Sequence, residues 1–286
     1  MTPPVPATVA AGSLAQYVRT VILHLFARRR DRRSVSGEHM RLEGKVAFIS
    51  GSTRGIGRTI AEMFAAEGAG VAVAGRSVEK GEKVVALIRN AGGNAIFVPL
   101  DVSDEDNVRA AIDSTAEHFG QLSILVNNAA ATDVVNTNIK PMTEYSTAEW
   151  NQILLTSLTG NVFWASKYAI PHLAAAGGGS IVNISSGAAM IGTAGLSAYT
   201  AAKGGMNALT RAMAVEGAPL NIRCNVIVVG RVISHSKDRG PDPVGMLTRV
   251  GKPSDIAYTA LWLASDESEF VTGSTVTADG GSLASA

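Results

Sequence analysis

Short apolar runs, many of them rich in β-branched residues, recur along the chain from residue 46 onward and alternate with segments of helical periodicity. Continuous apolar runs of this length are typical of strands that are buried on both faces, as in parallel sheets. The alternation predicts a doubly wound α/β fold with about seven parallel strands in a single domain. The runs are Val46–Ile49, Val71–Gly75, Ala95–Leu100, Leu122–Val126, the run ending in Ser185 and Ser186, Asn221–Val229, and the run ending at Ala278.

Residues 1–39 do not follow this pattern, so we expect an N-terminal extension there and a folded domain over 40–286. Apolar residues recur at helical spacing from Leu14 to Phe26, and five arginines follow in residues 28–33. One interpretation is a disordered extension, or a start site that the cell does not use. The other is an amphipathic helix that contacts an anionic membrane or acts as a targeting peptide. Membrane contact is therefore expected only through residues 13–33.

Charge and cysteine content exclude several functions. The whole chain has a net charge of +1, and residues 1–39 contain six arginines and two acids. The rest is slightly acidic, so nucleic acid is not an expected partner. The only cysteine is Cys224, and no metal-binding spacing of Cys and His occurs. No apolar run reaches the roughly 18 residues of a membrane span, and we expect a cytoplasmic protein.

The first strand leads into a glycine-rich turn, Ser50 to Gly57, and then a helix to about Glu67. Glycines let the backbone approach a pyrophosphate, and the helix N-terminus supplies N–H donors to it. This order of strand, turn and helix predicts the dinucleotide site of a Rossmann fold. The expected contacts are Gly51, Ser52, Thr53, Arg54, Gly55, Ile56 and Gly57.

The end of the second strand indicates which dinucleotide binds. NAD sites usually have an acidic residue there, which binds the ribose 2′-hydroxyl. This chain has Gly75 followed by Arg76, and Arg54 lies in the glycine turn. Two guanidinium groups suit a 2′-phosphate, so NADP(H) is favoured over NAD(H). The alternative is that both arginines face solvent.

A set of three polar residues follows the fifth apolar run. Ser186 ends the run, Tyr199 begins a helix thirteen residues later, and Lys203 lies one helical turn further on. Residues four apart share a helix face, so the Lys203 ammonium is expected near the Tyr199 phenol. A nearby positive charge lowers the pKa of a phenol, which then exchanges a proton with a carbonyl or alcohol oxygen. Ser186 would donate a hydrogen bond to the same oxygen.

With these motifs, the chain from about Met40 to Gly281 resembles the short-chain dehydrogenase/reductase family. It is most similar to the compact single-domain branch that includes the 3-oxoacyl-carrier-protein reductases. The resemblance implies that Ser186, Tyr199 and Lys203 are catalytic and that the enzyme is a homo-oligomer, a tetramer or a dimer. It also implies cofactor contacts by Asp101, Val102, Asn128, Ala129, Tyr199, Lys203, Gly230, Val232 and Ser234.

The chain departs from the family pattern at several positions. Ser50 stands where the family usually has Thr, and Ala130 stands where it has Gly. Within a long helix expected over Asn151–Ala176, Ser157 replaces an Asn that holds a water linked to the catalytic Lys. The register around Asn161 is one residue longer than usual. Either Ser157 holds that water, or a local bulge brings Asn161 into its place.

Two further departures lie near the C-terminal part of the predicted site. Val229 replaces a usual Pro, and residues 235–248 occupy the place of the family's substrate lid, which is expected to be short and contains Pro.

These observations predict an NADP(H)-dependent carbonyl reductase or alcohol dehydrogenase with a small-molecule substrate and Tyr199 as acid/base. Two alternatives remain. One is a nucleotide-binding sensor or scaffold with little catalysis. The other is an NAD-linked polyol or steroid dehydrogenase.

Overall fold

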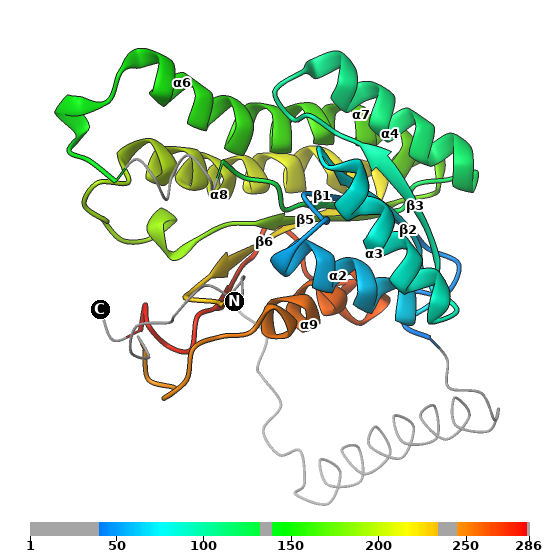
Figure 1. Cartoon of the computed structure of the whole chain (residues 1–286). Helices are drawn as coiled ribbons and strands as arrows, with labels where there is room; N and C mark the ends of the chain where they lie inside the picture. The colour runs from blue at the N-terminus through cyan, green and yellow to red at the C-terminus, as the bar shows by residue number, and fades with distance from the viewer. Residues whose placement is uncertain (1–39, 132–138, 234–244, 285–286) are drawn as a thin grey trace, which may run out of the picture. The chain divides into compact units, whose positions relative to one another are not determined.

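Seven strands pair in parallel in the order β3-β2-β1-β4-β5-β6-β7 (Figure 1). The computed structural model describes residues 40–131, 139–233 and 245–284. The predicted doubly wound α/β fold is confirmed. The strands are β1 (Val46–Ser50), β2 (Gly70–Gly75), β3 (Asn94–Pro99), β4 (Ile124–Asn127), β5 (Gly179–Ile184), β6 (Ile222–Val229) and β7 (Thr275–Ala278).

Helices cover both faces of the sheet, as Figure 1 shows. One face is covered by α2 (Gly55–Ala66), α3 (Val78–Asn90) and α9 (Pro253–Ala264). The other is covered by α4 (Glu105–Phe119), the π-helix η2 (Leu155–Trp164), α7 (Ala165–Ala175) and α8 (Ser197–Gly217). Helix α6 (Thr147–Leu154) packs against α8, where Ile153 and Ala198 form a small apolar cluster. Short 3-10 helices lie at η1 (Met142–Glu144), η3 (Gly187–Ala189), η4 (Ala218–Leu220) and η5 (Asp266–Ser268).

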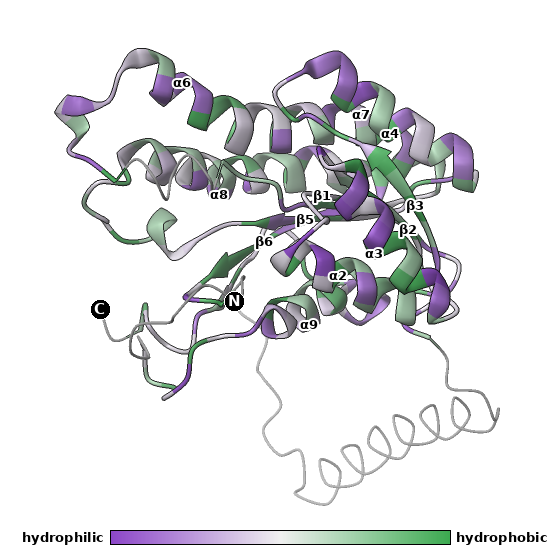
Figure 2. Ribbon diagram, in the orientation of Figure 1, coloured by the Kyte–Doolittle hydropathy of each residue, from purple (hydrophilic) through white to green (hydrophobic). Residues whose placement is uncertain are grey.

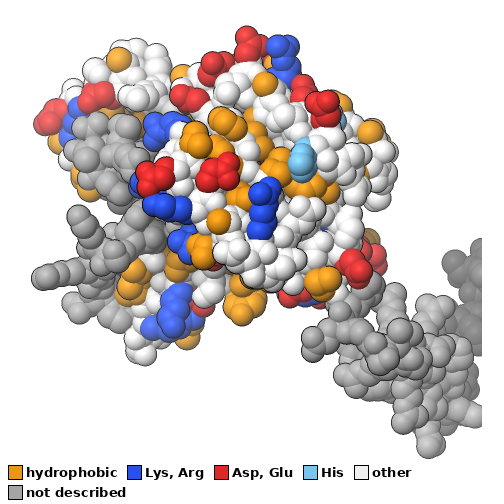
Figure 3. Space-filling view, turned by 45° about the vertical axis from the view of Figure 1, so that its right-hand side comes forward, with side chains coloured by type: hydrophobic (Ala, Val, Ile, Leu, Met, Phe, Trp, Pro, Cys, Tyr) orange, Lys and Arg blue, Asp and Glu red, His pale blue; other side chains and the backbone are white. Residues whose placement is uncertain are grey.

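The two helical layers bury two separate apolar cores, because successive side chains of a strand point to opposite faces. In β1, Ala47 and Ile49 belong to the core under α2 and α9, whereas Val46 and Phe48 belong to the core under α4 and α7. Figure 2 shows hydrophobic residues on β3 and β6 and hydrophilic ones along α3 and α4. On the face drawn in Figure 3, acidic and basic side chains are mixed among apolar ones.

The long helix expected over Asn151–Ala176 is present, and its interior is π-helical, as the expected local bulge requires. The structure has α6, then the ten-residue π-helix η2, then α7. The N–H of Ala165 bonds to the carbonyl of Gly160, five residues earlier, which is the π-helical pattern. A π-turn takes up one extra residue without shifting the flanking α-helices. This accounts for the long register around Asn161.

Gly160 lies in this π-helix directly against the loop after β3. A Cβ at Gly160 would overlap the carbonyl oxygen of Val102. Only glycine therefore fits at this crossing, and the π-helix and the Val102 loop are held in close contact.

Several predictions lie outside the described residues. These are the N-terminal extension 1–39, Ser234, and the lid as far as residue 244. In the part of the chain that the structure does describe, no helix combines the length and apolar character needed to cross a membrane.

Two glycines in helices test this packing. Gly160→Ala is expected to lower the free energy of unfolding by about 1–3 kcal/mol, because the backbone at Val102 must move. Gly204→Ala in α8 is the matched control, since a Cβ there meets nothing within 4 Å. It should raise the free energy of unfolding by about 0.5–1 kcal/mol. Urea denaturation measures both, and equal effects would contradict the assigned contact.

Candidate active site

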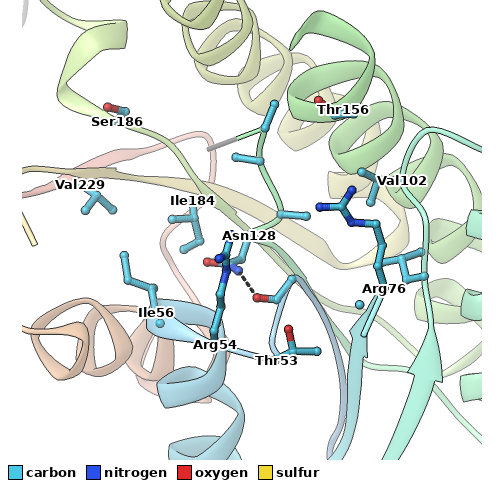
Figure 4. A pocket seen from close by; sticks show the side chains of 18 of the residues that line it. Thr53, Arg54, Ile56, Arg76, Val102, Asn128, Thr156, Ile184, Ser186 and Val229 are labelled. Carbon is cyan, nitrogen blue, oxygen red and sulfur yellow. Dashed lines mark hydrogen bonds between the residues drawn. The ribbon is translucent and has the colours of Figure 1, made fainter. Parts of the chain in front are cut away.

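A cavity of about 770 Å³ opens at the carboxyl ends of the strands, where the loops after β1, β2, β3, β4, β5 and β6 meet. Nearly all of the residues predicted from the sequence line it, although they come from distant parts of the chain. The set comprises Gly51, Thr53, Arg54, Gly55, Ile56, Gly57, Arg76, Asp101, Val102, Asn128, Ala129, Ser186, Tyr199, Lys203, Gly230 and Val232. Figure 4 shows Arg54 and Arg76 extending into this space from the glycine turn and from the end of β2.

Of the predicted site residues that the structure describes, Ser52, Ser157 and Asn161 do not line the cavity. The Ser52 side chain is fully buried. The Ser52 hydroxyl donates to the carbonyl of Ile49 at 2.6 Å and accepts from the N–H of Ala74 at 2.9 Å. It therefore ties the turn to β2, and its predicted cofactor contact is not supported for the side chain.

The glycine turn is shaped for close backbone approach. Gly51 has φ +64°, and a Cβ at Gly57 would overlap the Asn128 amide and the carbonyl of Gly51. Helix α2 begins at Gly55 with no side chain capping its first N–H groups and no acidic residue in its first turn. These unclaimed donors and the positive end of the helix dipole suit the pyrophosphate of a dinucleotide.

The three predicted catalytic residues converge on the same cavity. Ser186 follows β5, while Tyr199 and Lys203 lie one turn apart near the start of α8. The Lys203 ammonium lies 5.7 Å from the centre of the Tyr199 ring, and a hydrogen bond joins the side chains of Ser186 and Tyr199. The cavity thus combines a proton-transfer group, an oxygen-orienting hydroxyl and a dinucleotide cradle.

Comparisons with known proteins agree with this geometry. The sequence profile of the family described as "Enoyl-(Acyl carrier protein) reductase" matches residues 51–282. The chain belongs to the short-chain dehydrogenase/reductase family. It is an NAD(P)-dependent oxidoreductase of that family, acting on CH–OH or C=O groups.

Two curated relatives and one solved structure illustrate the similarity of this chain to known proteins. The 7alpha-hydroxysteroid dehydrogenase of Clostridium sardiniense is 41% identical over 82% of this chain and 91% of its own length. The 2,5-dichloro-2,5-cyclohexadiene-1,4-diol dehydrogenase of Sphingobium indicum is 39% identical over 84% of this chain and 97% of its own. A 7alpha-hydroxysteroid dehydrogenase complexed with NADH and 7-oxo glycochenodeoxycholic acid superposes with TM-score 0.78. It is 31% identical, covering 85% of this chain and 96% of that one.

The expected low pKa of Tyr199 is wrong for this geometry. Burial raises the pKa of the phenol above its usual 10, and the hydrogen bond with Ser186 opposes this only in part. The Lys203 ammonium is directed elsewhere, donating to the carbonyl of Ile184 at 2.7 Å. Desolvation of the phenolate is therefore the dominant effect on Tyr199, and the Lys203 charge is not among the causes that lower the pKa of the phenol.

Lys203 is the most unusual group of the site. It is 2% exposed, and burial lowers its pKa from 10.5 to about 7. No acidic residue is among the causes of this shift, so desolvation of the ammonium is not offset by an ion pair. A lysine held at this pKa gains or loses its charge near neutral pH.

Ser157 and Asn161 are both fully buried in η2, and they face different partners. The Ser157 hydroxyl accepts from the N–H of Ala131 at 3.2 Å, in the loop after β4. The Asn161 side-chain oxygen accepts from the Ser50 hydroxyl at 2.6 Å, at the end of β1. The bulge considered in the sequence is present, but it directs Asn161 toward the glycine turn.

The departures from the family pattern at Ala130 and Val229 are compatible with the backbone of the site. Ala130 lines the cavity, and Asn221 is the only non-glycine residue of the described chain with positive φ, so Ala130 needs no glycine-like backbone. Val229 also lines the cavity. Asp101 lines it too, and hydrogen bonds from Ser103 lower the pKa of its carboxyl group.

Sequence reasoning missed Ser77, Lys80, Gln152 and Thr156, which also line the cavity. Ser77 begins α3 and accepts from the N–H of Lys80 at 3.4 Å. A Ser directly after Arg76 and before a helical segment is an N-cap pattern that could have been recognised. Lys80 in that first turn then follows from helix geometry.

The buried charge of Lys203 predicts a pH-dependent cost in stability. The folded-state pKa of about 7 lies below the usual 10.5, so the cost is complete below pH 7 and fades as pH rises toward 10.5. Lys203→Met should therefore raise the melting temperature most below pH 7, and progressively less at higher pH, while turnover is lost.

Thermal scans of Lys203→Met across this pH range test the prediction. Lys83→Met, at an exposed position in α3, is the control and should change the melting temperature little throughout. A lower melting temperature for Lys203→Met at acidic pH would show that the charge is not buried as described.

Proposed function

We propose that this enzyme is an NADP(H)-dependent oxidoreductase that interconverts a secondary alcohol and its carbonyl compound, with Tyr199 as acid/base. The observation that carries the proposal is that Ser186, Tyr199 and Lys203 line the same cavity as the glycine turn. A substrate oxygen beside Tyr199 would then lie next to the reactive end of a dinucleotide held by that turn.

Each of the chain's own groups has a distinct task. NADP(H), when bound, supplies or accepts the hydride. The Tyr199 hydroxyl gives its proton to the carbonyl oxygen during reduction, and Ser186 donates a hydrogen bond to that oxygen as charge develops on it. Because burial raises the pKa of Tyr199, the phenol holds its proton at neutral pH.

Three cationic side chains around the end of β2, from the glycine turn, from the end of the strand itself and from α3, support NADP(H). Arg54, Arg76 and Lys80 line the cavity together with Gly75, which carries no acidic side chain. Guanidinium groups bind phosphate oxygens through paired, charge-assisted hydrogen bonds. The main competing cofactor is NAD(H), which is bound in a related solved structure.

A cyclic ketone or alcohol is the substrate class that we propose. The relatives described above are named for steroid and cyclohexadiene substrates. In this chain, large apolar side chains are exposed on the loops after β4, β5 and β6, at the edge that carries Ser186. Ile139 packs on Gly195, and the Tyr145 hydroxyl donates to the carbonyl of Gly195 at 2.9 Å, which joins two of these loops.

Removal of the Tyr199 hydroxyl tests the chemistry. With NADPH and a panel of cyclic ketones, Tyr199→Phe should lower kcat by roughly 10²–10⁴-fold, because proton transfer is lost. NADPH binding should change little. Tyr168→Phe is the control, since the Tyr168 hydroxyl donates to Glu105 away from the cavity. Saturable NADPH binding by the wild type without turnover of any carbonyl would favour a nucleotide-binding sensor instead.

Cofactor choice is tested at Arg76. Arg76→Ala should raise the KM for NADPH by roughly 10–100-fold and change the KM for NADH by less than about threefold, because a 2′-phosphate contact is lost. Arg109→Ala, which removes an exposed partner of Asp106 on α4, is the control and should change neither. A wild-type preference for NADH would contradict the NADP(H) assignment.

A further inference from the structure

The extra residue of the π-helix contacts the glycine turn through a single buried hydroxyl. Asn161 is fully buried, and its Oδ1 accepts from the Ser50 Oγ at 2.6 Å. The two residues are 111 positions apart, in η2 and at the end of β1. The contact exists because the π-turn directs Asn161 toward the sheet.

Ser50 is the junction between β1 and the loop after β4. Its Oγ accepts from the N–H groups of Asn128 and Ala129, each at 3.0 Å. A serine hydroxyl has one hydrogen to donate and two lone pairs that accept. The hydrogen points to Asn161 at 2.6 Å, and the carbonyl of Val126 is a second, longer acceptor at 3.3 Å. With the hydrogen on Asn161, both lone pairs are directed at the two amides. Asn161, as the closer acceptor, thereby favours this rotation of the Ser50 hydroxyl.

The loop that Ser50 holds forms one wall of the cofactor cavity. Asn128 and Ala129 both line it, and the Asn128 amide donates to the carbonyls of Ser50 and Gly51 at 2.9 and 3.1 Å. The same amide lies where a Cβ of Gly57 would be. A shift of this loop would therefore change the space beside the glycine turn.

The π-helix also contacts a second wall of the cavity. Gly160, the residue before Asn161, lies against the carbonyl of Val102, which lines the cavity from the loop after β3. Two successive residues of the π-helix thus contact two segments beside the dinucleotide site. Gly160 contacts the backbone of Val102, and Asn161 bonds to the Ser50 hydroxyl.

We propose that Asn161 is a positioning residue for the dinucleotide site, acting through Ser50 on Asn128 and Ala129, and not a member of the proton relay. Thr is usual at the place of Ser50 in the family, and its methyl group restricts side-chain rotation. Ser50 lacks that restraint, and Asn161 supplies one. The proton-transfer groups lie elsewhere, since Lys203 donates to Ile184 and Ser157 accepts from Ala131.

A contribution to folding stability does not explain the presence of Asn161 at this buried position. Its Nδ2 is buried and has no hydrogen-bond acceptor among the described residues. A buried donor without an acceptor opposes folding. Asn161→Leu, which fills nearly the same volume, should therefore keep or raise the melting temperature while it weakens cofactor binding. A residue with a purely structural role would lose both together.

The experiment measures NADPH binding by fluorescence titration for the wild type, Asn161→Leu, Ser50→Ala and the double variant. Each single substitution should raise the Kd by roughly tenfold, the equivalent of one well-placed hydrogen bond. The double variant should bind as weakly as Ser50→Ala alone, because Asn161 acts only through that hydroxyl. With saturating NADPH, kcat and its pH profile should stay close to those of the wild type.

Three outcomes would overturn the inference. An unchanged Kd, effects that multiply in the double variant, or a lower kcat with a shifted pH profile each contradict a positioning role through Ser50. Asn161→Ala repeats the measurement if the Leu variant does not fold. Thr115→Val is the control, since it removes a buried hydroxyl that bonds only within α4.

The inference rests on the proposed function, but the two fail differently. A wild type that binds no NADPH would refute the proposed function. A wild type that binds NADPH with the same Kd as Asn161→Leu would refute only the role of Asn161.

Discussion

Burial of the parallel sheet on both faces is the constraint on which the rest of this structure depends. With helices covering both faces, strand interiors such as Val46–Ile49 have to be apolar, and polar groups gather where the strands end. Parallel strands all end at the same edge. Gly51, Asn128 and Ser186, which are far apart in the chain, therefore meet around one cavity.

The proton-transfer pair, Tyr199 and Lys203, is buried in an environment that disfavours the charged form of each side chain. Helix α8 packs on the sheet, and this burial raises the pKa of Tyr199 and lowers that of Lys203 to about 7. Both shifts favour the neutral forms. The site thus keeps a protonated phenol beside a lysine that titrates near neutral pH, at a cost in stability that a hydrophobic residue would not impose.

The π-helix shows how one additional residue is absorbed without disturbing a fold. An insertion in an α-helix would rotate every later side chain by about 100°. The π-turn confines the change to Leu155–Trp164, so α7 keeps its face toward the sheet. The bulge lies next to the site: Gly160 contacts the backbone of Val102, which lines the cavity, and Asn161 contacts Ser50 at the end of β1.

The sequence alone determined the order of strands and helices, the glycine turn, and the Ser186, Tyr199 and Lys203 set, because each depends on residues close together in the chain. Only the tertiary structure decided where buried side chains point. Ser52 was predicted in the site but bonds to β2, and Asn161 faces Ser50 rather than the lysine. The pKa of Tyr199 was predicted in the wrong direction, since local spacing shows the charged neighbour but not the loss of water. Desolvation and partner choice depend on residues that are distant in sequence, and packing alone brings them together.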